Sequence, residues 1–174
     1  DSGMDLVVLL DTSWSMRASE AGRPRFEAAR DAARAAAAFA GDAGRVAAGG
    51  VSEGLDAPLA FSESAAAAQA ALGRLSPGWR GTDLAAGVSA ACRFLASRPT
   101  PAARRREVAV FSDGTATAAQ GFGRGAAPPD CPPDVALVGL APAAGLPNAA
   151  VLSAGPAHEG QAPGLEARLA LYGG

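Results

Sequence analysis

The sequence contains no lysine, so all 15 of its basic residues are arginines. Enzymes that accept a phosphoryl group on an aspartate at a strand end usually need a lysine and a second carboxylate beside it, and the missing lysine argues against that class. Against 17 acidic residues the net charge is −2. No broad basic surface is expected to attract a phosphate backbone, so we expect no nucleic-acid partner.

The only run of consecutive arginines is short. Arg104, Arg105 and Arg106 stand just before a predicted strand. We predict that they lie in a solvated loop between a helix and that strand, since short charge runs are more often solvated than involved in nucleic-acid binding.

Cysteine and aromatic residues are also scarce. Aromatic residues make up 5% of the chain, so the core is expected to be built from small side chains. The two cysteines, Cys92 in a helical pattern and Cys131 in the loop "PPDCPP", do not form a C-x-x-C metal or redox pair. We expect Cys92 to be a free, buried thiol. The cysteine count leaves the redox compartment open.

No apolar run approaches the ~20 residues that a membrane span requires, and no signal peptide is present. We therefore expect no membrane contact by this chain. It begins at Asp1 without a methionine and ends at Gly174 within a strand-like pattern, and we expect it to be a piece of a longer protein. At 174 residues and 49% apolar content it can bury the core of about one domain.

Apolar runs that suit buried strands alternate with stripes that suit amphipathic helices. The pattern predicts strands at 5–10, 45–52, 57–64, 107–114 and 132–140, and helices at 25–40, 64–75 and 82–97. This alternation predicts an α/β fold with a doubly wound, mainly parallel sheet flanked by helices.

The texture of the sequence changes after Gly145. Two segments with alternating apolar residues, 150–154 and 165–172, are joined by a Gly- and Pro-rich loop. We therefore divide the chain into an α/β domain at 1–147 and a β extension at 148–174. The extension is either a β-hairpin or the start of a further all-β module.

Side-chain oxygens gather where the first predicted strand ends. Asp11, Ser13 and Ser15 occur in "DTSWSM", Thr82 occurs in "GTDL" at a helix start, and Asp113 occurs in "FSDG" at another strand end. Ligands bind beyond the carboxyl ends of parallel strands, so these loops are expected to meet. Asp and Ser oxygens suit Mg²⁺, Mn²⁺ or Ca²⁺ far better than zinc.

These motifs resemble the von Willebrand factor type A (vWA) family over roughly residues 4–147. "DTSWSM" is similar to the family's D-x-S-x-S signature, and "GT" and "SDG" stand at the places that the family uses. The resemblance implies a metal-ion-dependent adhesion site with Mg²⁺, or Mn²⁺ or Ca²⁺. It further implies a protein partner that presents an Asp or Glu side chain. Ser13, Ser15 and Thr82 would contact the ion directly, and Asp11 and Asp113 largely through water.

The end of the chain resembles bacterial membrane-anchored vWA proteins of the aerotolerance-associated Bat type. The segments "LPNAAVLSAGPA" and "LEARLALYGG" stand where such proteins run into an immunoglobulin-like β module. This resemblance implies a membrane-anchored parent protein in the bacterial cell envelope, with the domain facing the periplasm.

Two other functions stay open. The domain could be a vWA-like scaffold without metal, in which Asp11, Ser13 and Ser15 only cap a turn. It could also be a serine hydrolase, because "GVSEG" matches G-x-S-x-G around Ser52, with Asp113 or Asp134 and then His158 later in the chain. Gly54 and Pro58 argue against the helix that such a nucleophile needs.

Two residues beside the motifs have open roles. Asp83 either orients a metal ligand or interacts with the dipole of the helix that it precedes. Trp14 is either an exposed contact residue or folds back over its loop.

Overall fold

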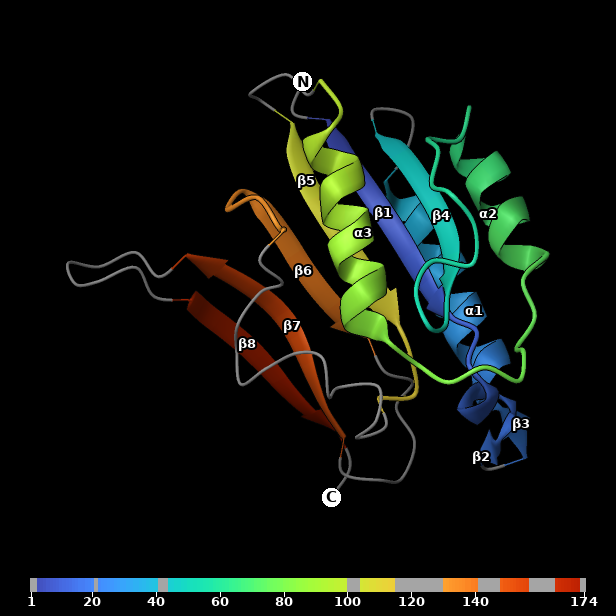
Figure 1. The fold of residues 1–174 in the computed structure, drawn as a ribbon. Coiled ribbons are helices and arrows are strands. Elements are labelled where there is room, and N and C mark those ends of the chain that lie inside the picture. The colour runs from blue at the N-terminus through green and yellow to red at the C-terminus, as the bar shows by residue number, and fades with distance from the viewer. Residues whose placement is uncertain are drawn as a thin grey trace.

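Four parallel strands form the central sheet of the computed structural model, in the order β4-β1-β5-β6 (Figure 1). They are β1 (Met4–Asp11), β4 (Arg45–Val51), β5 (Arg105–Phe111) and β6 (Val135–Leu140). The structure describes residues 3–20, 22–40, 44–99, 104–114, 130–140, 148–156 and 165–172.

β1 is a central strand, and both of its faces are covered. Seven of its eight residues are buried. Leu6, Val8 and Leu10 belong to one core cluster, and Val7 and Leu9 to the other. This two-sided burial is the reason that the run at 5–10 lacks polar alternation.

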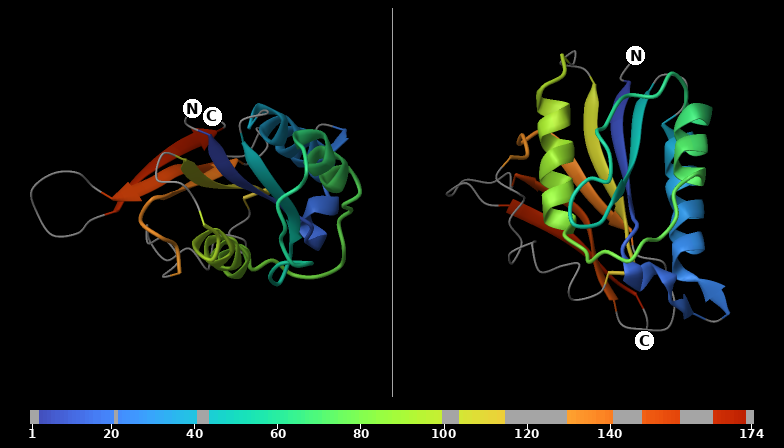
Figure 2. Two further views of the ribbon diagram at one scale, coloured as in Figure 1. Left: turned by 90° about the horizontal axis from the view of Figure 1, so that it is seen from above. Right: turned by 45° about the vertical axis from the view of Figure 1, so that its right-hand side comes forward.

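Helices cover both faces of the sheet, as a doubly wound fold requires (Figure 2). α1 (Arg25–Phe39) and α2 (Ala65–Gly73) pack on one face, and α3 (Leu84–Ala96) packs on the other. The predicted helices and fold class are confirmed. α3 comes very close to the sheet, since a Cβ built on Gly87 would lie 2.2 Å from Cγ2 of Val51.

Short elements connect β1 to α1, and a hairpin follows β6. The first group comprises the 3₁₀ helix η1 (Trp14–Arg17) and the strands β2 (Ser19–Glu20) and β3 (Arg23–Pro24). The antiparallel pair β7 (Asn148–Pro156) and β8 (Leu165–Tyr172) lies where the sequence predicts β structure, with β7 beside β6 (Figure 1). The domain boundary at 147 stays a prediction.

The strand predicted at 57–64 is wrong. The segment makes one isolated bridge, between Phe61 and Ala47, and the backbone N–H of Ser62 donates to the carbonyl of Val46 at 2.8 Å. Pro58 has no N–H to contribute to a ladder, which explains the irregular course. The segment instead lies along β4, the edge strand of the sheet.

The solvated loop predicted for the arginine cluster is also wrong. Arg105 begins β5, and Arg106 is paired with Asp134. Nε of Arg104 and Nε of Arg45 each donate to Oδ1 of Asp5 at 2.9 Å. Asp5 is fully buried, so these two guanidinium groups compensate its charge at the amino end of β1.

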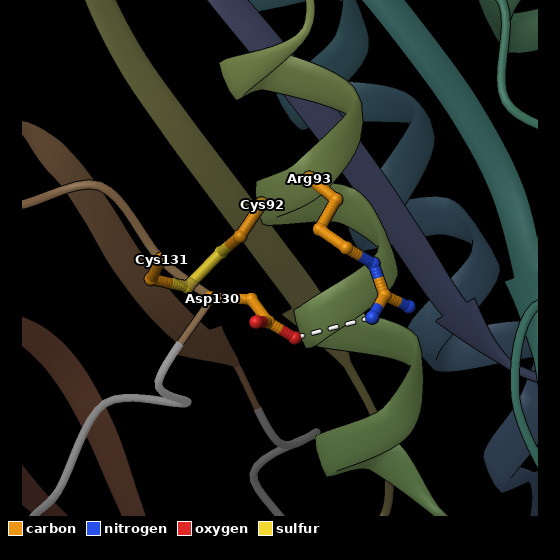
Figure 3. Close-up of a disulfide and its surroundings, with 4 residues drawn as sticks. All are labelled: Cys92, Arg93, Asp130 and Cys131. Atoms are coloured by element: carbon orange, nitrogen blue, oxygen red, sulfur yellow. Dashed lines mark hydrogen bonds and ion pairs between the residues drawn. A yellow bond between two sulfur atoms is a disulfide. The ribbon is translucent and has the colours of Figure 1, made fainter.

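The expectation of a free Cys92 is wrong as well, because Cys92 and Cys131 form a disulfide (Figure 3). The bond joins α3 to the segment that leads into β6, and beside it Arg93 pairs with Asp130 at 3.2 Å. The cysteines are 39 residues apart, so no short spacing in the sequence could reveal the pairing.

We expect reduction of this disulfide to lower the free energy of unfolding by about 2–4 kcal/mol, because the bond restricts the unfolded chain. Urea denaturation with and without a reductant measures the change. The double variant Cys92→Ala/Cys131→Ala is the control, and the reductant should leave its midpoint unchanged. Equal midpoints for the oxidised and reduced wild-type protein would contradict the expectation.

Candidate metal site

The last residue of β1, Asp11, lies fully buried at the carboxyl end of the sheet. The backbone N–H of Ser13 donates to Oδ1 of Asp11 at 2.8 Å. The hydroxyl oxygens of Ser13 and Ser15 lie 3.1 Å apart. The first motif therefore gathers side-chain oxygens in the loop after β1, and their binding of an ion stays a prediction.

The loop that follows Asp11 is held by the hydrophobic core and by the turn after β4. Met16 of η1 is fully buried in the core, and this fixes which way the loop turns. The hydroxyl of Thr12 donates to Oδ2 of Asp56 at 2.6 Å, and the hydroxyl of Ser52 donates to Oδ1 of the same carboxylate at 2.7 Å. Asp56 thus ties the loop after β1 to the turn after β4.

The loop after β5 brings a second carboxylate. The hydroxyl of Ser112 donates to Oδ2 of Asp11 at 2.6 Å, and the next residue, Asp113, is 5% exposed. Nη1 of Arg25, the first residue of α1, donates to Oδ2 of Asp113 at 3.2 Å. Gly114 then turns the chain with a φ of 64°, a conformation that favours glycine.

Thr82 lies in a third loop, which backbone hydrogen bonds tie to the first. The N–H of Trp14 donates to the carbonyl of Arg80 at 3.0 Å, and the N–H of Asp83 donates to the carbonyl of Ser52 at 2.6 Å. Thr82 is half-buried between these two anchors. These bonds place the loop of Thr82 beside the loop that carries Ser13 and Ser15, and the approach of the Thr82 hydroxyl to theirs stays a prediction.

Asp83 acts as the N-cap of α3. Its carboxylate accepts a hydrogen bond from the backbone N–H of Ala86 at 2.9 Å. This geometry satisfies a backbone donor in the first turn of the helix and suits the dipole interpretation of Asp83. Trp14 is 60% exposed, which favours the exposed position over one folded back on its loop.

Burial raises the pKa of Asp11 above its ordinary value, and the nearby charge of Asp113 acts in the same direction. The hydrogen bonds from Ser112 and Ser13 oppose this rise. With both carboxylates ionised and Arg25 protonated, these three side chains carry a net charge of −1. The two carboxylates can therefore compensate the charge of a cation, and the atoms that they would offer as ligands are all oxygens.

The sequence model of the von Willebrand factor type A domain matches residues 6–115, which include β1 from Leu6 onward, all of β5, and the positions Asp11, Ser13, Ser15, Thr82 and Asp113. The chain belongs to the von Willebrand factor type A domain family. No curated protein sequence matches the chain.

Solved structures share this vWA fold at low sequence identity. The conserved hypothetical protein BatB from Bacteroides thetaiotaomicron is 19% identical with a TM-score of 0.65, over 97% of this chain and 80% of that one. An aerotolerance-related membrane protein from Bacteroides fragilis is 19% identical with a TM-score of 0.61, over 97% and 81%. A von Willebrand factor type A structure from Catenulispora acidiphila is 22% identical with a TM-score of 0.57, over 79% and 33%.

Two residues of the vWA site were missed by reasoning from the sequence. Ser112 stands in "FSDG" beside Asp113, and its position at the end of a buried strand was a usable signal. Arg25 is 88 residues from Asp113 and belongs to a helix, so no spacing rule connects the two.

The turn after β4 lacks the structure of a hydrolase nucleophile. A nucleophile elbow leads from a strand directly into a helix. In this vWA domain, residues 52–64 contain no helix, and the hydroxyl of Ser52 donates to Asp56. Asp134 is paired with Arg106, and His158 lies outside the described residues.

Replacing Asp11 by Asn should leave the metal-free vWA domain at least as stable at pH 7 as the wild type. Because the pKa of Asp11 is raised on folding, the folded domain binds this proton more tightly than the unfolded chain does. Ionisation of Asp11 therefore lowers the free energy of unfolding once the pH exceeds the ordinary pKa of a carboxyl group. Thermal unfolding at pH 7 in EDTA measures the difference.

Ser112→Ala is the matched variant, since it keeps the charge of Asp11 and removes a donor to it. We expect a loss of about 1–3 kcal/mol for a buried acceptor deprived of its partner. If Asp11→Asn loses as much stability as Ser112→Ala under these conditions, the buried negative charge of Asp11 does not destabilise the folded domain as we expect.

Proposed function

We propose that this vWA domain binds one divalent cation, Mg²⁺ or else Mn²⁺ or Ca²⁺, and uses it to capture an acidic side chain of a partner protein. The ion would be held by oxygen atoms of Asp11, Ser13, Ser15, Thr82 and Asp113. The observation that carries the proposal is the buried carboxylate of Asp11, with the paired hydroxyls of Ser13 and Ser15 beside it at the carboxyl end of the sheet.

The chemistry of the donors supports a hard cation. Mg²⁺, Mn²⁺ and Ca²⁺ prefer oxygen ligands, and the proposed set contains carboxylates and hydroxyls alone. No group of three or more His, Cys, Asp and Glu side chains gathers anywhere in the described part of the chain. A cation at this place would therefore depend on neutral serine and threonine oxygens as much as on carboxylates.

The charge balance supports capture of an acidic partner. With both carboxylates ionised and Arg25 protonated, Asp11, Asp113 and Arg25 would leave a bound divalent cation with an excess positive charge. A carboxylate supplied from outside would neutralise that excess and fill an open coordination position. The partner is accordingly expected to present Asp or Glu.

The family supports binding over catalysis. vWA domains mediate protein–protein interactions, and this chain matches the family model over the strands and loops that form the site. The alternative within the same fold is a scaffold domain that binds its partner without metal. A titration with Mg²⁺ separates the two.

We further propose that the domain belongs to a membrane-anchored protein of the bacterial cell envelope and faces the periplasm. One similar structure comes from an aerotolerance-related membrane protein. The disulfide between Cys92 and Cys131 supports an oxidising compartment. Within the described residues, none of the helices combines the length and the apolar character needed to cross a bilayer.

We expect Mg²⁺ to raise the melting temperature of the domain. A ligand that binds only the folded state at about 100 times its Kd adds ~2.7 kcal/mol, which corresponds to about 5–10 °C for a chain of this size. Asp11→Ala and Ser13→Ala should abolish the shift. Ser64→Ala, which removes the N-cap hydroxyl of α2, is the control and should keep it. If wild type shows no shift with Mg²⁺, Mn²⁺ or Ca²⁺, the scaffold alternative holds.

Replacing Arg25 by Gln should tighten Mg²⁺ binding by about three- to tenfold. The substitution removes a positive charge that contacts Asp113 and would repel the ion. Isothermal titration calorimetry measures the affinity. Arg30→Gln is the matched control, because Arg30 lies on the same helix and pairs with Glu27. Weaker binding by Arg25→Gln would show that Arg25 supports the site instead of opposing the ion.

A further inference from the structure

Two large aromatic side chains are exposed on the loops that form the candidate site. Within the described residues, the exposed large hydrophobic side chains are Trp14 (60%), Phe39 (87%) and Trp79 (78%). Trp14 stands between Ser13 and Ser15, and Trp79 lies in the loop that leads to Thr82. These are the only two tryptophans of the chain.

The exposure of Trp14 follows from how its loop is held. η1 directs Met16 into the core, while Trp14 at the start of the same short helix stays outside. The N–H of Trp14 donates to the carbonyl of Arg80 at 3.0 Å, so the loop that carries Trp14 is joined to the loop that carries Trp79. The two indoles are thus presented by one hydrogen-bonded unit.

Trp79 is held by an arginine. The guanidinium carbon of Arg17 lies 4.0 Å from the centroid of the Trp79 ring, and Nη1 of Arg17 donates to the carbonyl of Pro77 at 3.2 Å. The N–H of Gly78 donates to the carbonyl of Thr12 at 2.7 Å. A side chain fixed in this way loses little conformational entropy when a partner binds.

The charge of this surface is positive at the Trp79 end. Arg17 and Arg80 are both exposed there. The acidic residues of the same region are Glu53, whose carboxylate lies 3.7 Å from a Cβ built on Gly81, and the helix cap Asp83. Glu53 lies in the turn after β4, and Asp83 lies at the end of the loop that leads into α3.

We propose that Trp14, Arg17, Trp79 and Arg80, here called the tryptophan rim, bind the residues that flank the captured acidic side chain of the partner. Tryptophan and arginine are the residues that most often dominate binding energies at interfaces. The rim selects an extended partner segment with an apolar side chain, which packs on the indoles, and a second acidic residue, which pairs with an arginine. This inference rests on the proposed function.

The test uses random 12-residue peptides displayed on phage and selected on the whole chain in Mg²⁺. Enriched sequences should contain at least two acidic residues with an apolar residue near them. Synthetic versions of these peptides should bind about tenfold or more weakly to Trp79→Ala and to Arg80→Gln. Phe39→Ala is the matched control, because it removes an exposed aromatic residue of α1 outside the rim and should leave the affinity unchanged.

Intrinsic fluorescence gives a second measurement without added labels. Since both tryptophans of the chain lie in the rim, peptide binding should shift their emission to shorter wavelength and protect them from acrylamide. Trp14→Phe and Trp79→Phe assign the signal to one indole each. A melting curve of each variant verifies that it is folded.

The outcomes separate this inference from the proposed function. Peptide binding that is lost in EDTA but unaffected by the rim variants overturns the rim and supports the metal site. Binding that the rim variants weaken and EDTA does not change supports the rim and overturns the metal function. The rim is also overturned if no peptide is enriched, if enriched peptides lack acidic residues, or if the emission responds only to vesicles of phosphatidylglycerol and phosphatidylcholine.

Discussion

The buried carboxylate of Asp11 is the interaction on which the site depends. It stands at the end of β1 and accepts hydrogen bonds from the backbone of Ser13 and from the hydroxyl of Ser112, so one side chain links two loops that are about a hundred residues apart in sequence. Because an unsatisfied buried carboxylate is costly, these bonds fix how the loops approach each other. The third loop joins the assembly through backbone contacts to Trp14 and Ser52.

β1 carries a buried aspartate near each end, and the two are compensated differently. Asp5, near the amino end, is paired with the guanidinium groups of Arg45 and Arg104. Within the described residues, Asp11 accepts hydrogen bonds from neutral donors alone, and the one arginine that reaches this region contacts Asp113. The amino end of the strand therefore has its countercharges built in, whereas the carboxyl end keeps an excess of negative charge beside exposed loops.

Patterns that are local in the sequence predicted most of the fold. The uninterrupted apolar run of β1 and the apolar stripes of α1 and α3 reflect how these segments are buried. This burial can be predicted from the sequence of each segment alone. Features that depend on distant segments were not predictable in this way. The pairing of Cys92 with Cys131 and the approach of Arg25 to Asp113 exist only because the completed sheet brings their elements together. The convergence of Asp11, Ser13, Ser15, Thr82 and Asp113 on one ion likewise depends on three distant loops, and it stays a prediction.

The attachment of α3 has a mechanical consequence. Gly87 brings the helix against Val51 of β4, and Cys92, five positions further along, ties it covalently to the segment before β6. The helix is therefore held in two ways, by packing against a strand and by a covalent bond to the segment before β6. A displacement of α3 away from β4 would have to separate Gly87 from Val51 and carry the disulfide-linked segment along with the helix.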